Sequence, residues 1–438
     1  MCYNKPMPDT ATDAQHFTKA VTQLGEKHTL VTTSAIYSEQ GVKIVDQGVA
    51  VTAKLYERLM QHKIATPLEE AMQVESAVNG KALRATAEAL IDEQPLFARM
   101  VARPADRSLL LDLIETVPLP APVALQLTVA RDIHPDQYRY FVATALTAAW
   151  LGQDGMAARY DLSMLAAAGL LHDLGMLHID PVLLDPKQPI RGAQRRQLYA
   201  HPLVSALLLE RHHEYPKELI RAVREHHGAL DGSGYPGALA GDAISPWGRV
   251  LSLAKTVAAL AKPCRRHAEL RLSVLLRTNR HRYDATLVNR LLPLLQLTAE
   301  QDADAESAEV AVPDPVARLA AIEQALTDWP ASLAQAPNLS TARRNGLAHI
   351  ATRCANIRRT QLEAGAASEQ LASLDTAAVT GLLAMELSLI CQELAWQVRA
   401  VQRQALRRWT LGADETYPEA LQDWIAAVDA ACAGLIDT

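Results

Sequence analysis

Aromatic residues are scarce in this chain: Phe, Trp and Tyr together make up 5% of its 438 residues. Strands favour aromatic and β-branched side chains, whereas alanine and leucine, which dominate here, favour helices. We therefore expect a mainly α-helical fold. An excess of positive charge is also missing, because the formal net charge is −6. This composition gives no basic surface for nucleic acid or for an anionic membrane.

Paired cysteines and long apolar runs are missing as well. The five cysteines are scattered and form no CxxC motif, which indicates a reduced chain in the cytoplasm rather than a disulfide framework. The first residues, MCYNKPMPDTATDAQ, lack the apolar core of a secretory signal peptide. No stretch approaches the roughly 18 uninterrupted apolar residues that a membrane span needs. The sequence therefore predicts a soluble cytoplasmic protein.

Patterns along the chain predict four parts. Residues 1–125 hold short β-rich runs broken by glycines, then helical periodicity, which predicts a small α+β module with a β-hairpin. Residues 126–298 are helical in pattern almost throughout, apart from one glycine-rich loop. Residues 299–315 are acidic and contain prolines, as linkers do. Residues 316–438 predict a C-terminal helical bundle or dimerisation arm.

Histidine is the most informative residue type. Seven of the 14 histidines fall between His172 and His227, a window of about one eighth of the chain. Four features stand out there, namely His172-Asp173, His201-Pro202, His226-His227 and the run DGSGYP at residues 231–236.

A histidine and an aspartate inside the apolar run AAAGLLHDLGMLHI would put two polar groups into a core, which costs several kcal/mol unless a partner satisfies them. Imidazole nitrogens and a carboxylate oxygen together form a donor set that Zn, Mn or Fe accepts. The four features are too far apart in sequence for one loop to supply them all. Several helices of one bundle must therefore assemble the site.

Each feature alone has an ordinary structural explanation. An isolated HD dipeptide is common, an HP pair often starts a turn or a helix, and DGSGYP is a strong turn signal. The pair His212-His213 and the single His178 fit packing or capping. Only the four features together, in this order, predict a metal site.

The ordered set HD…HP…HH…DGSGYP resembles the HD-GYP family, a group of HD phosphohydrolases that hydrolyse cyclic di-GMP. The resemblance covers about residues 130–290, and HHGALDGSGYP is its most specific stretch. It implies a helical bundle that holds divalent metal ions, usually iron or manganese, and hydrolyses a phosphodiester. The metal ligands implied by matching positions are His172, Asp173, His201, His226 and His227, and the implied substrate-binding turn is Gly234, Tyr235 and Pro236.

Four positions depart from the family pattern. No histidine stands near Tyr140 or Val142, where the family has one, and Met176 replaces the lysine of HDxGK. Gly228 replaces the glutamate of HHE, and Lys255 replaces a late aspartate ligand. These losses predict a partly degenerate active site.

The change to Lys255 has a physical consequence, because an ammonium at bonding distance from a metal ion is strongly repelled in a low-dielectric site. We expect a site with fewer ions than active family members, reduced to one, in which Lys255 fills the vacated position and pairs with Asp173. The alternative is that Lys255 extends to solvent.

Two kinds of function follow. The losses favour a signalling protein of cyclic di-GMP metabolism or sensing with weak or absent activity, acting as a receptor or as a protein-interaction module through its C-terminal helices. The alternative is an active phosphodiesterase in which Asp173 and Lys255 take part in catalysis; hydrolysis of another nucleotide is a weaker one. Arg280 is a candidate phosphate contact, since guanidinium groups suit phosphates. The C-terminal helices are also a candidate homodimer surface.

Overall fold

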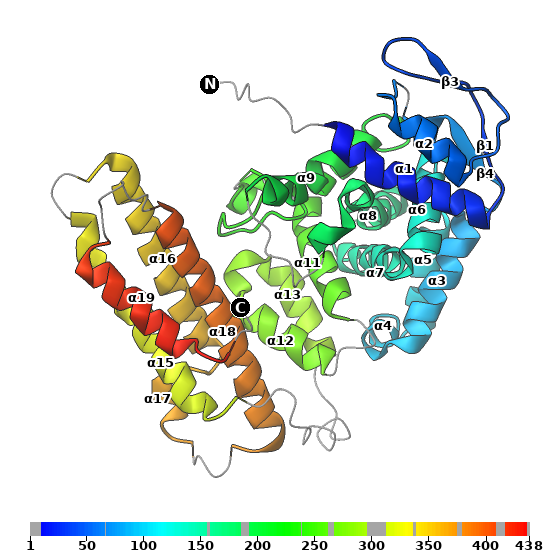
Figure 1. Cartoon of the computed structure of the whole chain (residues 1–438). Helices are drawn as coiled ribbons and strands as arrows, with labels where there is room; N and C mark the ends of the chain where they lie inside the picture. The colour runs from blue at the N-terminus through cyan, green and yellow to red at the C-terminus, as the bar shows by residue number, and fades with distance from the viewer. Residues whose placement is uncertain are drawn as a thin grey trace. The chain divides into compact units, whose positions relative to one another are not determined.

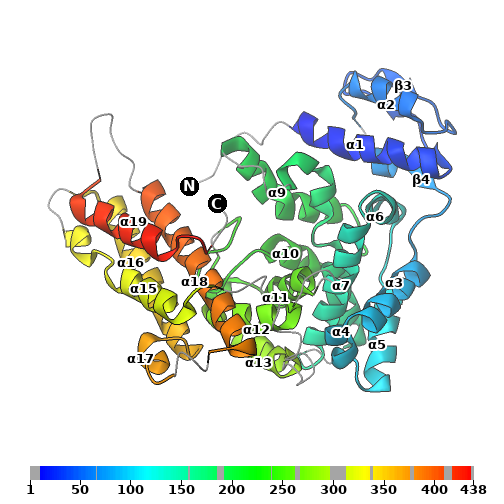
Figure 2. The same cartoon turned by 60° about the horizontal axis from the view of Figure 1, so that its bottom comes forward.

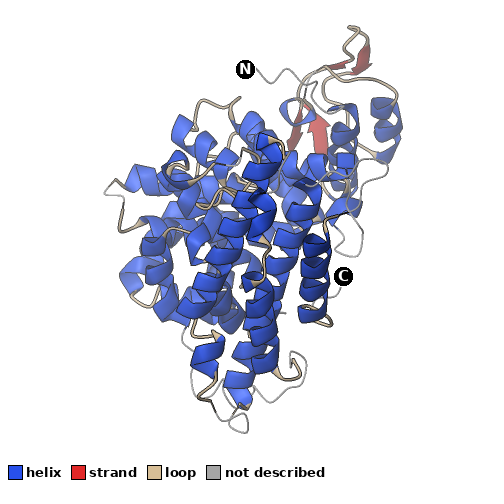
Figure 3. Ribbon diagram, turned by 90° about the vertical axis from the view of Figure 1, so that its left-hand side faces the viewer, coloured by secondary structure: helices blue, strands red, loops and turns tan. Residues whose placement is uncertain are grey.

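The computed structural model describes residues 10–65, 67–155, 158–184, 192–237, 239–261, 267–295, 312–335, 339–374, 379–408 and 417–435. Contacts group the chain into two compact units, Met1–Cys264 and Arg265–Thr438. The prediction of a mainly α-helical fold is confirmed, since helices dominate both units (Figure 3). The four-part division stays a prediction, and residues 299–311 of the expected linker lie outside the described residues. Among the residues that the structure describes, every helix is too short or too polar to cross a membrane.

The N-terminal part of the first unit contains all the strands that the described residues form (Figure 1). Strand β1 (Leu30–Thr32) pairs antiparallel with β4 (Met72–Val74), and β2 (Ile36–Tyr37) pairs antiparallel with β3 (Lys43–Val45). Gly41 lies between β2 and β3 with a φ of 78°, a backbone conformation that glycine adopts without strain. Three helical segments flank these strands, namely α1 (Thr10–Lys27), α2 (Ala53–Met60) and η1 (Leu68–Glu70).

Helices make up the rest of the first unit: α3 (Gly80–Glu93), α4 (Pro95–Met100), α5 (Pro104–Glu115), α6 (Ala121–Ile133), α7 (Pro135–Gly152), α8 (Arg159–Leu171), η2 (Leu174–His178), η3 (Pro181–Leu184), α9 (Gly192–Leu209), α10 (Lys217–Glu225), η4 (Gly241–Ala243) and α11 (Pro246–Leu260). Five of them, α4 to α7 and α11, carry proline in the first turn, where the missing N–H leaves no helical hydrogen bond unmade.

Helices α7 and α8 pack on each other at the centre of this unit and are buried along most of their length. Gly169 of α8 permits the close approach, because a Cβ there would lie 2.8 Å from the Cα of Ala145. His172 and Asp173 follow directly after α8 and are buried. The packing of α7 on α8 therefore places the His172-Asp173 pair, the first of the four sequence features, in the interior.

His178, at the end of η2, is partly buried against α1 of the first unit. Its ring stacks on Phe17 of α1 with 4.6 Å between the ring centroids. Its Nε2 is buried and has no hydrogen-bond partner among the described residues. Burial lowers the pKa of His178 to about 4.

This low pKa predicts a pH-dependent loss of stability. Because the pKa is lower in the folded chain than the ordinary 6.5, protonation favours unfolding; the stability from the neutral ring is complete above pH 6.5 and is lost as the pH falls toward 4. We expect protonation of His178 to lower the free energy of unfolding by roughly 3 kcal/mol across this window. Denaturant unfolding should show a flatter pH dependence for His178→Phe, whereas the exposed His213→Phe should keep the wild-type slope. Equal slopes in all three proteins would contradict this assignment.

The second unit is a helical bundle around the long helix α18 (Figure 2). An apolar stripe on α16, formed by Leu347, Ile350, Cys354 and Ile357 at spacings of three and four, is buried in its core. Cys354, Cys391 and Cys432 are buried free thiols. The segments of this unit are α12 (Ala268–Thr278), η5 (Arg280–Arg282), α13 (Ala285–Leu291), η6 (Leu292–Leu295), α15 (Pro315–Thr327), η8 (Ala331–Gln335), α16 (Thr341–Glu363), α17 (Ser368–Leu371), α18 (Gly381–Arg408) and α19 (Glu419–Ala431).

Candidate metal centre

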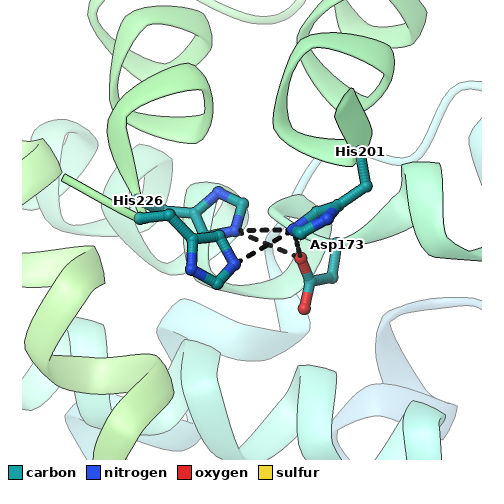
Figure 4. A group of neighbouring side chains, drawn as sticks. Asp173, His201 and His226 are labelled. Carbon is teal, nitrogen blue, oxygen red and sulfur yellow. Dashed lines mark hydrogen bonds and ion pairs between the residues drawn. The ribbon is translucent and has the colours of Figure 1, made fainter. Parts of the chain in front are cut away.

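Four side chains from three segments of the first unit converge on one point, namely Asp173, His201, His226 and His227. Figure 4 labels the first three of them. The Oδ1 atom of Asp173 lies 3.1 Å from Nε2 of His201 and 3.2 Å from Nε2 of His226. The two Nε2 atoms of His201 and His226 are 3.3 Å apart, and Nε2 of His227 lies 3.1 Å from that of His201. All four potential ligand atoms lie within 4.8 Å of one another.

His201 is oriented by the proline that follows it. Pro202 lies inside α9 and has no N–H, so the carbonyl of Leu198 four residues earlier lacks its helical donor. The Nδ1 atom of His201 is 2.6 Å from this carbonyl oxygen and donates to it. The neutral ring then carries its proton on Nδ1 and presents the lone pair of Nε2 to the cluster. The HP pair is thus part of a helix rather than the turn or helix start that is typical of an isolated pair.

His226 and His172 are held by the same kind of bond at the ends of their helices. Nδ1 of His226 donates to the carbonyl of Val223 over 2.6 Å, and Nδ1 of His172 donates to the carbonyl of Gly169 over 2.8 Å. Each ring therefore also has its lone pair on Nε2.

This arrangement fits a divalent cation. His201 and His226 both carry their protons on Nδ1, so their facing Nε2 atoms cannot hydrogen bond to each other, and Oδ1 of Asp173 is buried without a hydrogen-bond partner among the described residues. A cation between these atoms would satisfy Oδ1 of Asp173 and Nε2 of His226, and it would replace the contact of His201 with Nε2 of His227. Ligands about 2.1–2.3 Å from one ion and roughly at right angles lie about 3.0–3.3 Å apart, which agrees with the observed separations. The cluster could therefore hold a metal ion.

Asp173 and His226 have the protonation states that metal ligands need. Burial by itself raises the pKa of Asp173, but His172 and His201 outweigh it and hold that pKa well below its usual range. Burial lowers the pKa of His226 to about 3, even though Asp173 acts in the opposite direction. The aspartate is therefore ionised and the His226 ring is neutral.

His172 lies beside the cluster, but its Nε2 atom faces the hydroxyl of Tyr140. The hydroxyl of Tyr140 on α7 is 3.1 Å from this Nε2, and Oδ2 of Asp173 is 3.2 Å from it. Burial raises the pKa of Tyr140 well above its usual value, so the hydroxyl keeps its proton and donates to His172. In the sequence, Tyr140 stands out only because the family has a histidine near this position, and the structure gives this tyrosine a hydrogen bond of its own.

Lys255 of α11 is partly buried and contacts the fourth member of the cluster. Its Nζ atom lies 3.1 Å from Nδ1 of His227. An ammonium has no lone pair, so it donates, and a neutral His227 ring then carries its proton on Nε2. Burial first, and Lys255 second, hold the pKa of His227 well below its usual value. The expected pairing of Lys255 with Asp173 stays a prediction.

The DGSGYP run folds into a turn against the histidine pair. Oδ1 of Asp231 accepts hydrogen bonds from the backbone N–H and the hydroxyl of Ser233, at 2.9 and 2.6 Å. A Cβ at Gly234 would lie 2.4 Å from the carbonyl oxygen of His227, so this position needs glycine. The N–H of Tyr235 donates to the same carbonyl over 3.2 Å.

The ring of Tyr235 stacks between two others. It lies 4.3 Å from the ring of His227, with 19° between the planes, and 4.2 Å from the ring of Tyr199, with 11° between the planes. Nothing in the local sequence pattern distinguishes Tyr199, a tyrosine two residues before the HP pair, from other residues of its helix. Substrate contact by Gly234, Tyr235 and Pro236 stays a prediction.

Met176 and Arg280, two further positions noted in the sequence, are not members of the four-residue cluster. Met176, at the place of the family lysine, is part of η2 and partly buried. Arg280 belongs to the second unit, where its Nη2 atom donates to Oδ1 of Asn289 over 2.7 Å. Phosphate binding by Arg280 therefore stays a prediction.

Comparisons with known proteins agree with the motifs. Residues 85–287 match the family model described as HD domain. The chain is 35% identical over 101 residues to the 3'3'-cGAMP-specific phosphodiesterase 3 of Vibrio cholerae serotype O1. That match covers 23% of this chain and 22% of the relative, so this chain spans about a fifth of the relative's length. A similar solved structure is Bd1817, an HDG"Y"P protein from Bdellovibrio bacteriovorus, with 14% identity, a TM-score of 0.33, and coverage of 60% of this chain and 95% of that chain.

The family predicted from the ordered motifs is confirmed. The family model spans the Asp173, His201, His226 and His227 positions at which the potential ligand atoms converge. Residues 85–287 of the chain therefore form an HD domain, in agreement with the family predicted from the ordered motifs.

Proposed function

We propose that this chain is a signalling protein that binds a cyclic dinucleotide at a one-ion centre and hydrolyses it weakly. The proposal rests on the hydrogen bonds that His172 and His227 form with residues other than the rest of the cluster. Tyr140 donates to Nε2 of His172, and Lys255 donates to Nδ1 of His227. Asp173, His201 and His226 remain with their ligand atoms directed at one another.

The contact with Tyr140 makes His172 a poor ligand. A neutral imidazole has one lone pair, and on His172 that lone pair accepts from the buried hydroxyl. A metal ion could take this position only by breaking the hydrogen bond and leaving the hydroxyl without its acceptor. An unsatisfied buried polar group costs about 1–3 kcal/mol.

The contact with Lys255 acts on His227 in two ways. It places the ring proton on Nε2, the atom nearest the cluster, and a protonated nitrogen cannot bind a metal. It also adds a positive charge on the far side of the His227 ring, which disfavours a second cation beside this histidine. Both effects disfavour His227 as a ligand and support a single ion held by Asp173, His201 and His226. Such an ion takes the place of the hydrogen bond from Nε2–H of His227 to Nε2 of His201.

A single divalent ion, when bound, polarises a phosphoryl oxygen and lowers the pKa of a water molecule. The residues of the chain have separate roles around it. Asp173 supplies the negative charge, and the carbonyl-bound Nδ1 atoms of His201 and His226 keep both rings oriented. The Lys255 ammonium and the Nε2–H of His227 are donors that can face phosphate oxygens. Fewer ions leave less charge to stabilise a transition state, so we expect slow turnover.

The substrate class is supported by two resemblances. The sequence motifs are those of a family that acts on cyclic di-GMP, and the curated relative is a phosphodiesterase specific for 3'3'-cGAMP. Both ligands are cyclic dinucleotides made of purine nucleotides, and we take that class as the ligand. Manganese and iron are the metals that the resemblance and the mixed nitrogen and oxygen donors favour.

The test combines three measurements on the purified full chain loaded with Mn²⁺ or, without oxygen, Fe²⁺. We expect about one ion per chain by elemental analysis, binding of cyclic di-GMP or 3'3'-cGAMP by calorimetry, and slow formation of linear product by chromatography. His201→Ala should lose the ion and the hydrolysis, whereas His213→Ala, outside the cluster, should keep both.

Each outcome decides part of the proposal. Two or more tightly bound ions with fast turnover would establish the alternative, an active phosphodiesterase. Binding without any turnover would establish a receptor. If neither dinucleotide binds or reacts, the ligand class is wrong and a protein-interaction module is the remaining function.

A further inference from the structure

An aromatic stack leads from the cluster to the surface of the first unit. The rings of His227, Tyr235 and Tyr199 follow one another at 4.3 and 4.2 Å between centroids, and neighbouring planes deviate from parallel by 19° and 11°. Two rings cannot share one face of Tyr235 at these distances, so His227 and Tyr199 cover opposite faces. The stack therefore has a buried end at the cluster and an outer end at Tyr199.

Tyr199 leaves much of its ring uncovered. Its exposed fraction is 42%, although its inner face lies against Tyr235. This exposed part of the residue offers a surface to a further flat group. Aromatic rings stack in offset parallel pairs, and nucleobases stack on tyrosine because every base has a π-face.

We propose that Tyr199 is the platform on which one purine base of the cyclic dinucleotide stacks while the phosphodiester lies at the Asp173 cluster. This inference rests on the proposed function, and it names a residue that determines affinity for the ligand. The mechanism is geometric: the base continues the series His227, Tyr235, Tyr199 as its next member. The stack also holds Tyr199 in place, so little side-chain freedom is lost when the base binds.

A competing explanation comes from the same helix. Leu203 and Leu207 of α9 are also exposed, at 39% and 45%, and together with Tyr199 they recur every four residues. Such a stripe is typical of a helix that packs against another apolar surface. The stripe accounts for the exposure of the three side chains, but it gives no reason why the Tyr199 ring lies parallel to Tyr235 and His227. Leu207 lies two turns from Tyr199 and provides the matched control.

The test measures binding of cyclic di-GMP to the Mn²⁺-loaded full chain by calorimetry. Loss of one base–aromatic stack should raise the Kd of Tyr199→Leu by about fivefold or more, and Tyr199→Trp should bind within about twofold of the wild type. Tyr160→Leu, which removes an exposed tyrosine from α8, and Leu207→Ser should also stay within about twofold. In hydrolysis, Tyr199→Leu should raise KM while kcat stays within about twofold.

The outcomes separate this inference from the proposed function. An unchanged Kd for Tyr199→Leu, or an equal loss for Leu207→Ser, overturns the stacking role whatever the metal content. A wild-type chain that holds no ion or shows no turnover counts against the one-ion enzyme, and the comparison of Kd values still decides the role of Tyr199. If the wild type does not bind the dinucleotide, the stacking role is overturned, and the measured ion content still tests the metal centre.

Discussion

Asp173→Asn is expected to remove the bound ion and to lower phosphodiester hydrolysis by more than about 100-fold, since loss of an outer partner of a metal ligand already costs 10–100-fold. Asp173 is the one acidic member of the four-residue cluster. Its Oδ1 atom lies at 3.1 and 3.2 Å from the two Nε2 atoms of His201 and His226. Asparagine keeps the shape of the side chain and removes the negative charge, so the change isolates the electrostatic contribution.

Elemental analysis and product formation measure this effect on the same preparation. Asp180→Asn is the matched control, because Asp180 lies outside the cluster and its Oδ1 accepts from the N–H of Val182, which asparagine can also do. An Asp173→Asn protein that keeps its ion would show that the carboxylate is not a ligand. An Asp180→Asn protein that loses its ion would show that the assay responds to general damage.

The double substitution Tyr140→His with Lys255→Asp is expected to raise the metal content from about one to about two ions per chain, because it exchanges two competing donors for two ligands. The first change removes the hydroxyl that occupies Nε2 of His172. The second removes the ammonium beside His227 and adds a carboxylate to the same turn of α11. Turnover should rise with the second ion, since two ions stabilise both the attacking and the leaving oxygen.

The single variants and one control show which contact sets the number of ions. Lys255→Met removes the charge without adding a ligand, so we expect it to keep about one ion per chain. Each single substitution leaves one competing donor in place and should raise the metal content less than the double does. A double variant with unchanged metal content would show that Tyr140 and Lys255 do not limit the number of ions.

Much of this architecture could be predicted from sequence, because the informative residues carry their own local signal. Scarce aromatics and abundant alanine and leucine predicted the helical fold, and the ordered HD, HP, HH and GYP features predicted the family. The same features singled out Asp173, His201, His226 and His227, whose ligand atoms the structure brings together. In each case the chemistry of the residue type made the pattern recognisable.

Contacts that depend on packing could not be predicted in this way. The hydroxyl of Tyr140 meets His172 only because α7 packs on α8, and the missing histidine gave no hint of a replacement donor. Tyr199 takes its place in the stack from Tyr235, a residue far along the chain on another segment. Helical periodicity also does not reveal which helices group together, and α12 and α13 group with the C-terminal helices.

The proline inside α9 has a consequence for how the centre forms. The Leu198 carbonyl that Pro202 leaves without a donor fixes the orientation of the His201 ring through the protein's own backbone. The ring is therefore preorganised, and its rotational entropy is lost during folding rather than when the metal arrives. An alanine at position 202 would restore a competing amide proton and let the imidazole rotate, so this proline acts on metal affinity without touching the ion.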